Sequence, residues 1–233
     1  QNELSELQKD FINNMTHEFK TPLASILLAS NAISTNEKSK NDPILTRLTN
    51  IINQQNKRLT THVEKILDLA KLEKNKFLLF PERVDLHETI REMMPALNLR
   101  MESINGTIKL ELADEDVFIN ADKTHLTNVL DNLIDNAIKY SPKESPITLE
   151  ADLKSSRVSI RVKDEGKGVE AHEKKKIFDK FYRAGNEATR KAKGTGLGLY
   201  LTRKIIGSHK GEIFIKDNTP HGSIFIIELK QVL

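Results

Sequence analysis

The chain has 233 residues, of which 38% are hydrophobic and 30% charged, with a formal net charge of +3 and no cysteine. This composition is typical of a globular protein, and the length allows one large domain or two ordinary ones. The lack of cysteine excludes disulfides, thiolate metal sites and a cysteine nucleophile. The small net charge gives no argument for nucleic-acid binding, so we expect no nucleic-acid partner.

No apolar run reaches the ~18 residues that a membrane helix needs, so we expect no direct membrane contact in this fragment. The chain begins with Gln1 inside what already reads as a helical pattern, and its start has no signal-peptide pattern. We therefore expect a cytoplasmic fragment of a longer protein, and the pattern leaves open whether a membrane segment elsewhere anchors that protein.

Residues 1–75 contain no glycine and repeat apolar residues at spacings of three and four, as amphipathic helices do. A polar stretch from Ser34 to Pro43 separates two such patterns, which predicts a long helical hairpin. One hairpin cannot cover both apolar stripes, so we expect a homodimer that pairs two hairpins into a four-helix bundle through residues 1–75. The alternative is that the stripes pack on the rest of the same chain. The stripes contain Leu7, Phe11, Met15, Phe19, Pro22 and Ile26, and then Leu45, Leu48, Ile52, Leu59, Ile66, Leu69 and Leu72.

Beyond residue 75 the pattern changes, and all 10 glycines lie there. Short β-like runs alternate with helical patterns, which predicts an α+β sandwich with helices on one face of a mixed sheet. We therefore expect two domains, residues 1–75 and 76–233, joined near Lys74–Pro81. The expected strands are Ile108–Leu112, Val117–Ala121, Ile147–Leu153, Val158–Lys163, Glu212–Ile215 and Ser223–Leu229, and the expected helices are Leu86–Asn105, Lys123–Tyr140 and Gly198–Ser208.

Two glycine clusters in the second domain have the form of ligand-binding loops. The segment Asp164–Val169 follows a predicted strand, and its glycines allow a sharp turn close to a ligand, although a plain β-turn explains it about as well. The segment Gly194–Leu199 alternates three glycines and opens a helical pattern, so its free backbone N–H groups suit phosphate oxygens. Its spacing fits neither a Walker A loop nor a Rossmann fingerprint, and a flexible hinge is the alternative.

A third pattern places Asn132 and Asn136 four residues apart on one helix face, followed by Lys139. Asparagine is a poor helix former, so two of them on one face of an otherwise apolar helix suggest a function. An amide oxygen can ligate Mg²⁺, and a lysine can meet a phosphate as a point charge. The alternative is that both asparagines are ordinary surface residues.

Together these patterns resemble the N, G1 and G2 boxes of the nucleotide-binding fold shared by gyrase B subunits, MutL repair proteins, ninety-kilodalton heat-shock chaperones and sensor histidine kinases. Phe178–Arg183 resembles the F box peculiar to the histidine kinases, Gly222–Phe225 matches their late glycine pattern, and His17–Pro22 matches their H box. The motifs span nearly the whole chain in the expected order. The chain thus resembles the catalytic core of a two-component sensor histidine kinase: a dimerisation and histidine phosphotransfer domain, then an ATP-binding domain of the GHKL type.

The resemblance implies a site for ATP and Mg²⁺ in the second domain. Asp164 would accept a hydrogen bond from the adenine amino group, and Asn136 would be the Mg²⁺ ligand. The segment Tyr182–Lys193 would form the lid over ATP, where Arg183 and the basic run 190–193 would compensate phosphate charge, although the lid could equally be solvated surface. The other residues implied at the nucleotide are Asn132, Lys139, Tyr140, Gly166, Gly168, Gly194, Thr195, Gly196, Leu197 and Gly198.

The chain departs from the family pattern at one place, where His209-Lys210-Gly211 stands in the position of a frequent His-Gly-Gly. A residue other than glycine is tolerated where the backbone has an ordinary negative φ. We therefore expect Lys210 to be tolerated if its backbone angle is ordinary, and we do not change the predicted function because of it.

His17 is the phosphoryl acceptor that the resemblance implies. At about 100° per residue it points away from the apolar stripe of its helix, onto an exposed face that it shares with Thr21. Imidazole attacks phosphorus through an unprotonated nitrogen, and the neighbouring Glu18 can take the ring proton or stabilise the developing charge. The resemblance assigns Thr21 to the reverse, dephosphorylating reaction. Pro22 should bend the helix near His17, unless it serves packing alone, and the other six histidines, with His62 among them, are expected to be structural or surface residues.

The leading hypothesis is an ATP-dependent protein histidine kinase that phosphorylates its own His17 and passes the phosphoryl group to an aspartate of a response-regulator receiver domain. Phosphatase activity toward the same partner is left open, as is whether ATP reaches the histidine of its own chain or of the other chain. One alternative is an ATPase conformational switch related to gyrase or the chaperones, without phosphotransfer. The other alternative is a non-enzymatic dimerisation module with a degenerate nucleotide domain.

Overall fold

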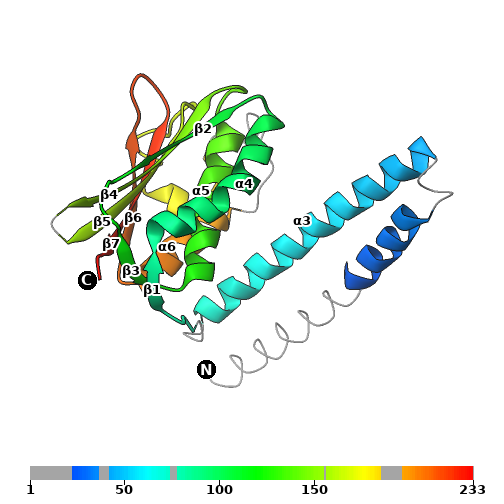
Figure 1. The fold of residues 1–233 in the computed structure, drawn as a ribbon, viewed down its shortest axis with the longest axis horizontal. Helices are drawn as coiled ribbons and strands as arrows, with labels where there is room; N and C mark the ends of the chain where they lie inside the picture. The colour runs from blue at the N-terminus through cyan, green and yellow to red at the C-terminus, as the bar shows by residue number, and fades with distance from the viewer. Residues whose placement is uncertain (1–22, 37–41, 74–77, 155, 185–195, 233) are drawn as a thin grey trace. The chain divides into compact units, whose positions relative to one another are not determined.

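The computed structural model divides into two compact units, Gln1–Phe77 and Leu78–Leu233 (Figure 1). The predicted acceptor motif, with His17, Glu18 and Thr21, lies outside the described residues, as does most of the predicted lid. The residues that the structure describes are 23–36, 42–73, 78–154, 156–184 and 196–232.

The described part of the first unit is a helical hairpin, as predicted: a helix over residues 23–35 and helix α3, Pro43–Glu73 (Figure 1). Pro43 is the first residue of α3, and the Asp42 carboxylate before it accepts a hydrogen bond from Ile44 N–H over 2.8 Å. Proline needs no N–H partner in a first turn, and aspartate caps that turn well, so both residues favour a helix start here.

Two buried polar side chains connect the helices of the hairpin. The Ser30 hydroxyl donates to the Thr49 carbonyl over 3.2 Å, and the Asn56 amide donates to the Leu23 carbonyl over 2.8 Å. Ser30 exposes 2% and Asn56 6% of its surface. Hydrogen bonds of this kind fix how the two helices face each other, because an unpaired polar group there would be costly.

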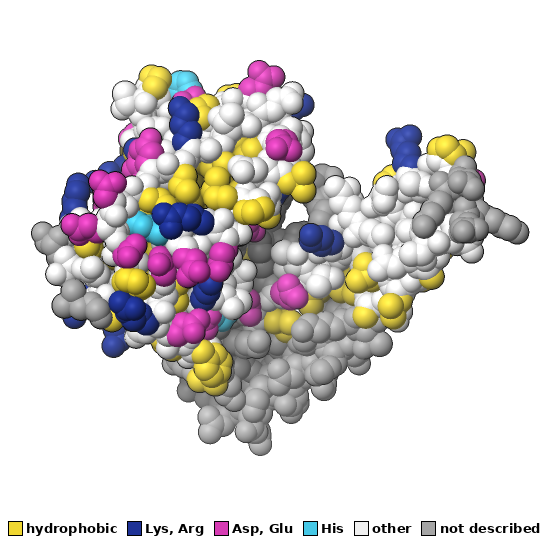
Figure 2. Space-filling model, viewed as in Figure 1, with side chains coloured by type: hydrophobic (Ala, Val, Ile, Leu, Met, Phe, Trp, Pro, Cys, Tyr) yellow, Lys and Arg dark blue, Asp and Glu magenta, His cyan; other side chains and the backbone are white. Residues whose placement is uncertain are grey.

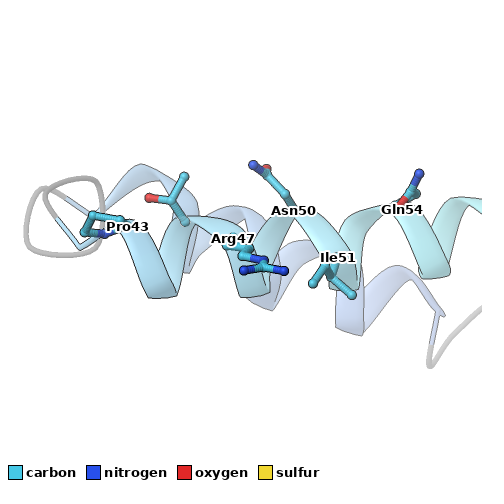
Figure 3. Close-up of a pocket in the computed structure, with 6 residues that line it drawn as sticks. Pro43, Arg47, Asn50, Ile51 and Gln54 are labelled. Atoms are coloured by element: carbon cyan, nitrogen blue, oxygen red, sulfur yellow. The ribbon is translucent and has the colours of Figure 1, made fainter. Parts of the chain in front are cut away.

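Large apolar side chains remain exposed on the hairpin, where Figure 2 shows them gathered on the surface. Leu28 and Ile44 each expose 70%, and Ile66 exposes 51%. An exposed apolar face of this extent is a feature of association surfaces. The same unit has an open groove of about 820 Å³ on α3, where apolar Ile51 lies between polar neighbours (Figure 3). The groove is lined by Pro43, Thr46, Arg47, Asn50, Ile51 and Gln54.

The second unit is built on a five-stranded mixed sheet with the strand order β2-β4-β5-β7-β6. Strands β2 and β4 are parallel, and the other neighbours are antiparallel. Figure 1 shows helices α4, α5 and α6 on one face of the sheet, so the predicted α+β sandwich is confirmed. The bounds are α4 Leu86–Glu102, β2 Thr107–Leu112, α5 Lys123–Tyr140, β4 Pro146–Lys154, β5 Arg157–Lys163, α6 Gly198–Ser208, β6 Glu212–Asp217 and β7 Ser223–Lys230.

Helix α5 joins the helical layer to the sheet, and its sequence explains why. Asp122 precedes it and accepts a hydrogen bond from His125 N–H over 3.1 Å, which caps its first turn. Its apolar residues recur on one face, while the alternate residues of β5 face the same interior. The buried side chains are Leu126, Val129, Leu130, Leu133, Ile134 and Ala137 on α5, and Val158, Ile160 and Val162 on β5.

Strand β1, Glu82–Asp85, was not predicted; it pairs antiparallel with β3, Phe118–Ala121, in a separate two-stranded sheet. Three of its four residues are charged, so no apolar run marks it, and only Val84 is buried. The strand is held by pairing and by Arg83, whose guanidinium lies 3.6 Å from the Phe118 ring centroid. A short 3₁₀ helix, Lys176–Phe178, was also not predicted.

The end of α6 corrects the expectation for Lys210, because its backbone angle is not ordinary. Lys210 has a φ of +59°, in the left-handed region. Its N–H donates to the Gly207 carbonyl over 2.9 Å, and the Gly211 N–H donates to the Ile206 carbonyl over 3.0 Å. These two bonds form a Schellman motif, in which glycine is the favoured residue at the left-handed position. The lysine therefore stands where its Cβ is sterically disfavoured.

We predict that Lys210→Gly raises the free energy of unfolding by about 0.5–1 kcal/mol, since it removes the Cβ from a left-handed position. Urea denaturation of the whole chain measures the difference. Lys210→Ala is the matched control, because it removes the same charge and keeps the Cβ. A glycine variant no more stable than the alanine variant would show that the left-handed angle costs nothing.

Candidate functional site

The side chain of Asp164 lies at the end of β5 and exposes only 4% of its surface. Oδ1 of its carboxylate accepts hydrogen bonds from Gly166 N–H over 2.8 Å and from Ser223 N–H over 3.2 Å. Burial raises the pKa of the Asp164 carboxyl, and the two backbone N–H groups offset part of this rise. Both of these bonds end on Oδ1, so Oδ2 is the oxygen available to a ligand donor.

Glycines let the backbone around Asp164 approach closely. Gly222 has a φ of +111°, and a Cβ there would lie 1.9 Å from the Asp164 carbonyl oxygen. Gly168 has a φ of +72°, and a Cβ on Gly166 would lie 2.7 Å from the Tyr140 carbonyl oxygen. The glycines of the predicted loop at residues 164–169 are thus required, because this loop passes directly against the end of α5.

The asparagine helix and the second glycine loop meet at Asn132. Its amide Nδ2 donates to the Thr202 hydroxyl on α6 over 3.0 Å. A Cβ on Gly198, the first residue of α6, would lie 2.4 Å from Asn132 Oδ1. Asn132 is therefore a residue that fastens α5 to the start of α6, and the glycine at position 198 makes this contact possible.

The next turns of α5 carry the other residues predicted to lie at the nucleotide, Asn136, Lys139 and Tyr140. Asn136 is half-buried, while Lys139 and Tyr140 are exposed, and Lys139 Nζ lies 5.1 Å from the Tyr140 ring centroid. Among the described residues, no group of three or more His, Cys, Asp or Glu side chains could hold a metal ion by itself. A metal at Asn136 would therefore need further ligands from a bound molecule or from water.

Two residues that flank the predicted lid, Phe181 and Gly196, are hydrogen-bonded to each other. The Phe181 N–H donates to the Gly196 carbonyl over 3.1 Å, and both residues have left-handed backbone angles, with φ of +65° and +71°. A Cβ on Gly196 would lie 2.6 Å from the Phe181 carbonyl carbon. Arg183 is half-buried just beyond this contact. Of the predicted phosphate loop, Gly194 and Thr195 lie outside the described residues.

Helix α6 begins without a side-chain cap from its own N-cap residue. Its N-cap is Leu197, which makes no side-chain hydrogen bond to the first turn. The first N–H groups of a helix have no partner within the helix, and the helix dipole makes this end attractive to anions. The start of α6 lies beside Asn132, whose Oδ1 faces Gly198, so an amide group and backbone donors meet there.

The structure also shows positioning residues that the sequence analysis did not single out. The Thr202 hydroxyl orients Asn132, and Ser223 N–H holds the Asp164 carboxylate. The Asn218 amide donates to the Asp164 carbonyl over 2.9 Å. Ser223 belongs to the late glycine pattern, so its motif gave a signal for it, whereas single polar residues such as Thr202 and Asn218 gave none.

Comparison with known proteins agrees with this geometry. Residues 121–233 match the family described as histidine kinase-, DNA gyrase B- and HSP90-like ATPase, and residues 7–75 match the His Kinase A (phospho-acceptor) domain. Sensor protein RprX of Bacteroides fragilis is 37% identical over 231 residues, which are 98% of this chain and 44% of RprX. The chain therefore spans less than half the length of this relative.

Solved structures of histidine kinases share the fold. ShkA in complex with AMPPNP has a TM-score of 0.80 at 22% identity, over 96% of this chain and 46% of ShkA, which shows the fold. Histidine kinase ThkA in complex with response regulator TrrA has a TM-score of 0.66 at 26% identity, over 98% of this chain and 64% of ThkA.

The second unit thus has the fold and the loops of the gyrase, HSP90 and histidine kinase ATPases. Together with the phospho-acceptor domain before it, this assigns the chain to a family: it belongs to the sensor histidine kinases of two-component signalling. No described helix is both long and apolar enough to cross a membrane.

We predict opposite effects for alanine at the two glycines of α6. A Cβ on Gly207 meets no atom within 4 Å, so Gly207→Ala should raise the free energy of unfolding by up to about 1 kcal/mol. Gly198→Ala should lower it by about 1–3 kcal/mol, because the Asn132 amide must move away from the Thr202 hydroxyl. Thermal or urea unfolding of both variants measures the pair. If the two variants changed the free energy of unfolding equally, the position of the Asn132 amide would not depend on a glycine at position 198.

Proposed function

We propose that this chain is an ATP-dependent protein histidine kinase, in which residues 76–233 bind ATP with Mg²⁺ and phosphorylate His17 in the dimerisation and phosphotransfer domain, residues 1–75. The phosphoryl group then passes to an aspartate of a response-regulator receiver domain. The observation that carries the proposal is that α5 meets both glycine loops: Asn132 contacts Gly198, and the Tyr140 carbonyl lies against Gly166 in the loop of the buried carboxylate Asp164. The complex of ThkA with response regulator TrrA supports the kind of partner.

The residues of the second unit fit ATP group by group. Oδ2 of Asp164 can accept a hydrogen bond from an exocyclic amino group such as that of adenine. The uncapped N–H groups at the start of α6 suit the phosphates, with Gly194–Gly198 as the loop around them. Lys139 and Arg183 supply positive charge, and Tyr140 borders the same helix end. The paired residues Phe181 and Gly196 would hold the lid at its base.

Asn136 is the residue that would hold Mg²⁺, because an amide oxygen is a suitable ligand for a hard cation that is also bound by phosphates. When bound, the metal would neutralise charge on the phosphate oxygens. The chain's own donors have the same role: the backbone at the start of α6 and the cations of the lid stabilise charge that builds up during transfer.

At the acceptor, we infer a nucleophilic step. The unprotonated ring nitrogen of His17 forms a bond to the γ-phosphorus of ATP, and the bond from that phosphorus to the bridging oxygen breaks, so that ADP leaves. Glu18 takes the proton from the other ring nitrogen or stabilises the positive ring. Thr21 would position water for removal of a phosphoryl group from the receiver domain, if the chain also acts as a phosphatase.

We also propose that two chains form a homodimer through residues 1–75. The apolar side chains exposed on the hairpin, such as Leu28 and Ile44, need a cover, and a second hairpin would supply one. A four-helix bundle of this kind would leave the polar faces of the helices for the receiver domain.

We predict that Asp164→Asn lowers the affinity for ATP or AMPPNP by roughly 10- to 100-fold, because an amide N–H₂ would replace Oδ2 and face the adenine amino group, donor against donor. The fold should remain at least as stable near neutral pH. Burial raises the pKa of Asp164, so ionisation above that pKa costs the folded state free energy, and a neutral amide avoids this cost. Calorimetric titration measures the affinity.

Asp114→Asn, at an exposed carboxylate outside the site, is the matched control for this substitution and should bind like the parent chain. Unchanged affinity in a folded Asp164→Asn chain would remove this residue from the nucleotide site.

For the reaction itself, we predict that incubation with γ-labelled ATP and Mg²⁺ gives an acid-labile label on the chain, and that His17→Gln loses it while still binding ATP. A receiver domain added afterwards should take up the label. Steady ATP hydrolysis that continues in the His17→Gln variant, with no label in the parent chain or in the variant, would favour the ATPase switch. An acid-labile label that remains in His17→Gln would show that another residue is the acceptor.

A further inference from the structure

Asp122 and His209 form a hydrogen-bonded joint within the second unit. The Asp122 N–H donates to His209 Nε2 over 3.0 Å, and His209 Nδ1 lies 2.8 Å from the Ile205 carbonyl oxygen. The Asp122 carboxylate accepts from His125 N–H and from Phe80 N–H, each over 3.1 Å. Asp122 exposes only 7% of its surface. We call this group the Asp122–His209 joint.

Both nitrogens of the His209 imidazole take part in the joint, and this fixes which nitrogen carries the proton. Nε2 accepts a hydrogen bond, so it carries no proton. A neutral imidazole then has its proton on Nδ1, which donates to Ile205. A charged ring would place a second N–H against the Asp122 N–H. The position therefore requires an acceptor and a donor on opposite sides of one side chain, which is more than packing alone would require.

Three segments of the chain meet at the joint. His209 is the C-cap of α6, whose first residue is Gly198 at the predicted phosphate loop. Asp122 is the N-cap of α5, the helix that carries Asn132 and Asn136. Phe80 is the third residue of the second unit, which begins at Leu78, so it lies where the chain arrives from the first unit.

The helices α5 and α6 are thus fastened at two levels. Near the predicted phosphates, Asn132 on α5 is bonded to Thr202 on α6. At the other end, Asp122 is bonded to His209. The two levels lie two to three helical turns apart, at about 3.6 residues per turn. Helices fixed at both levels cannot slide past each other, so a displacement at the start of α6 is carried to the end that binds Phe80.

We propose that Asp122 and His209 are positioning residues for phosphotransfer. They hold the phosphate-loop helix, the asparagine helix and the chain arriving from the first unit as one body, so that the nucleotide and this arriving segment keep one orientation relative to each other. This inference rests on the proposed histidine kinase function. A positioning role predicts a loss in the rate of phosphorylation with little loss in nucleotide affinity.

The test compares His209→Leu with His209→Gln in the whole chain. Leucine removes both hydrogen bonds, and we expect AMPPNP affinity within about threefold of the parent and phosphorylation at saturating ATP at least tenfold slower. Glutamine offers an oxygen for Asp122 N–H and an N–H₂ group for Ile205, so it should recover most of the rate. Lys210→Gly is the control, since it changes the same helix end and keeps the imidazole.

Amide hydrogen exchange gives a second readout that does not depend on phosphotransfer. AMPPNP should slow exchange at the Phe80 amide in the parent chain, and this effect should be lost in His209→Leu. The proposal is overturned if Phe80 does not respond to AMPPNP, or if affinity and rate fall together in His209→Leu. A parent chain that shows the Phe80 response but acquires no label on histidine would contradict the kinase function and leave the joint as a mechanical link.

Discussion

The proposed nucleotide site depends on holding one carboxylate, that of Asp164, almost entirely out of water. A buried carboxylate is costly unless it is hydrogen-bonded, and two backbone N–H groups supply these bonds. They can reach it only because Gly222, whose Cβ would overlap the Asp164 carbonyl, lets the start of β7 pass against the end of β5. The result is a directional acceptor at the end of β5, the central strand of the sheet, and its surroundings are fixed by backbone rather than by side chains.

Much of this arrangement follows from sequence patterns, because its parts are local. Helical periodicity predicted the hairpin and α5, and the spacing of Asn132 and Asn136 placed both on one helix face. The alternating glycines predicted loops with close backbone contacts, and the structure shows such contacts at Gly166, Gly196 and Gly198. Local patterns succeed here since the backbone angle or the helix period alone dictates the residue type.

What the sequence could not supply is the set of single contacts between distant segments. The bond from Asn132 to Thr202 joins residues 70 positions apart, and that from Asp122 to His209 joins residues 87 positions apart. Thr202 does not stand out from its neighbours, and the family pattern at residues 209–211 marks His209 without naming a partner, so tertiary packing alone gives each its partner. Lys210 shows the reverse case, in which a side chain gives no hint that its backbone is left-handed.

In the proposed reaction, a nucleotide unit built around Asp164 and Asn136 phosphorylates His17, more than a hundred residues away in sequence. Mass-spectrometric peptide mapping of the intact chain after incubation with ATP and Mg²⁺, under alkaline conditions that preserve phosphorus–nitrogen bonds, tests it most directly. We expect one phosphoryl group on the peptide that contains His17 and none on peptides with the other six histidines. A phosphoryl group on a different histidine, or on no histidine while ATP is bound, would contradict it.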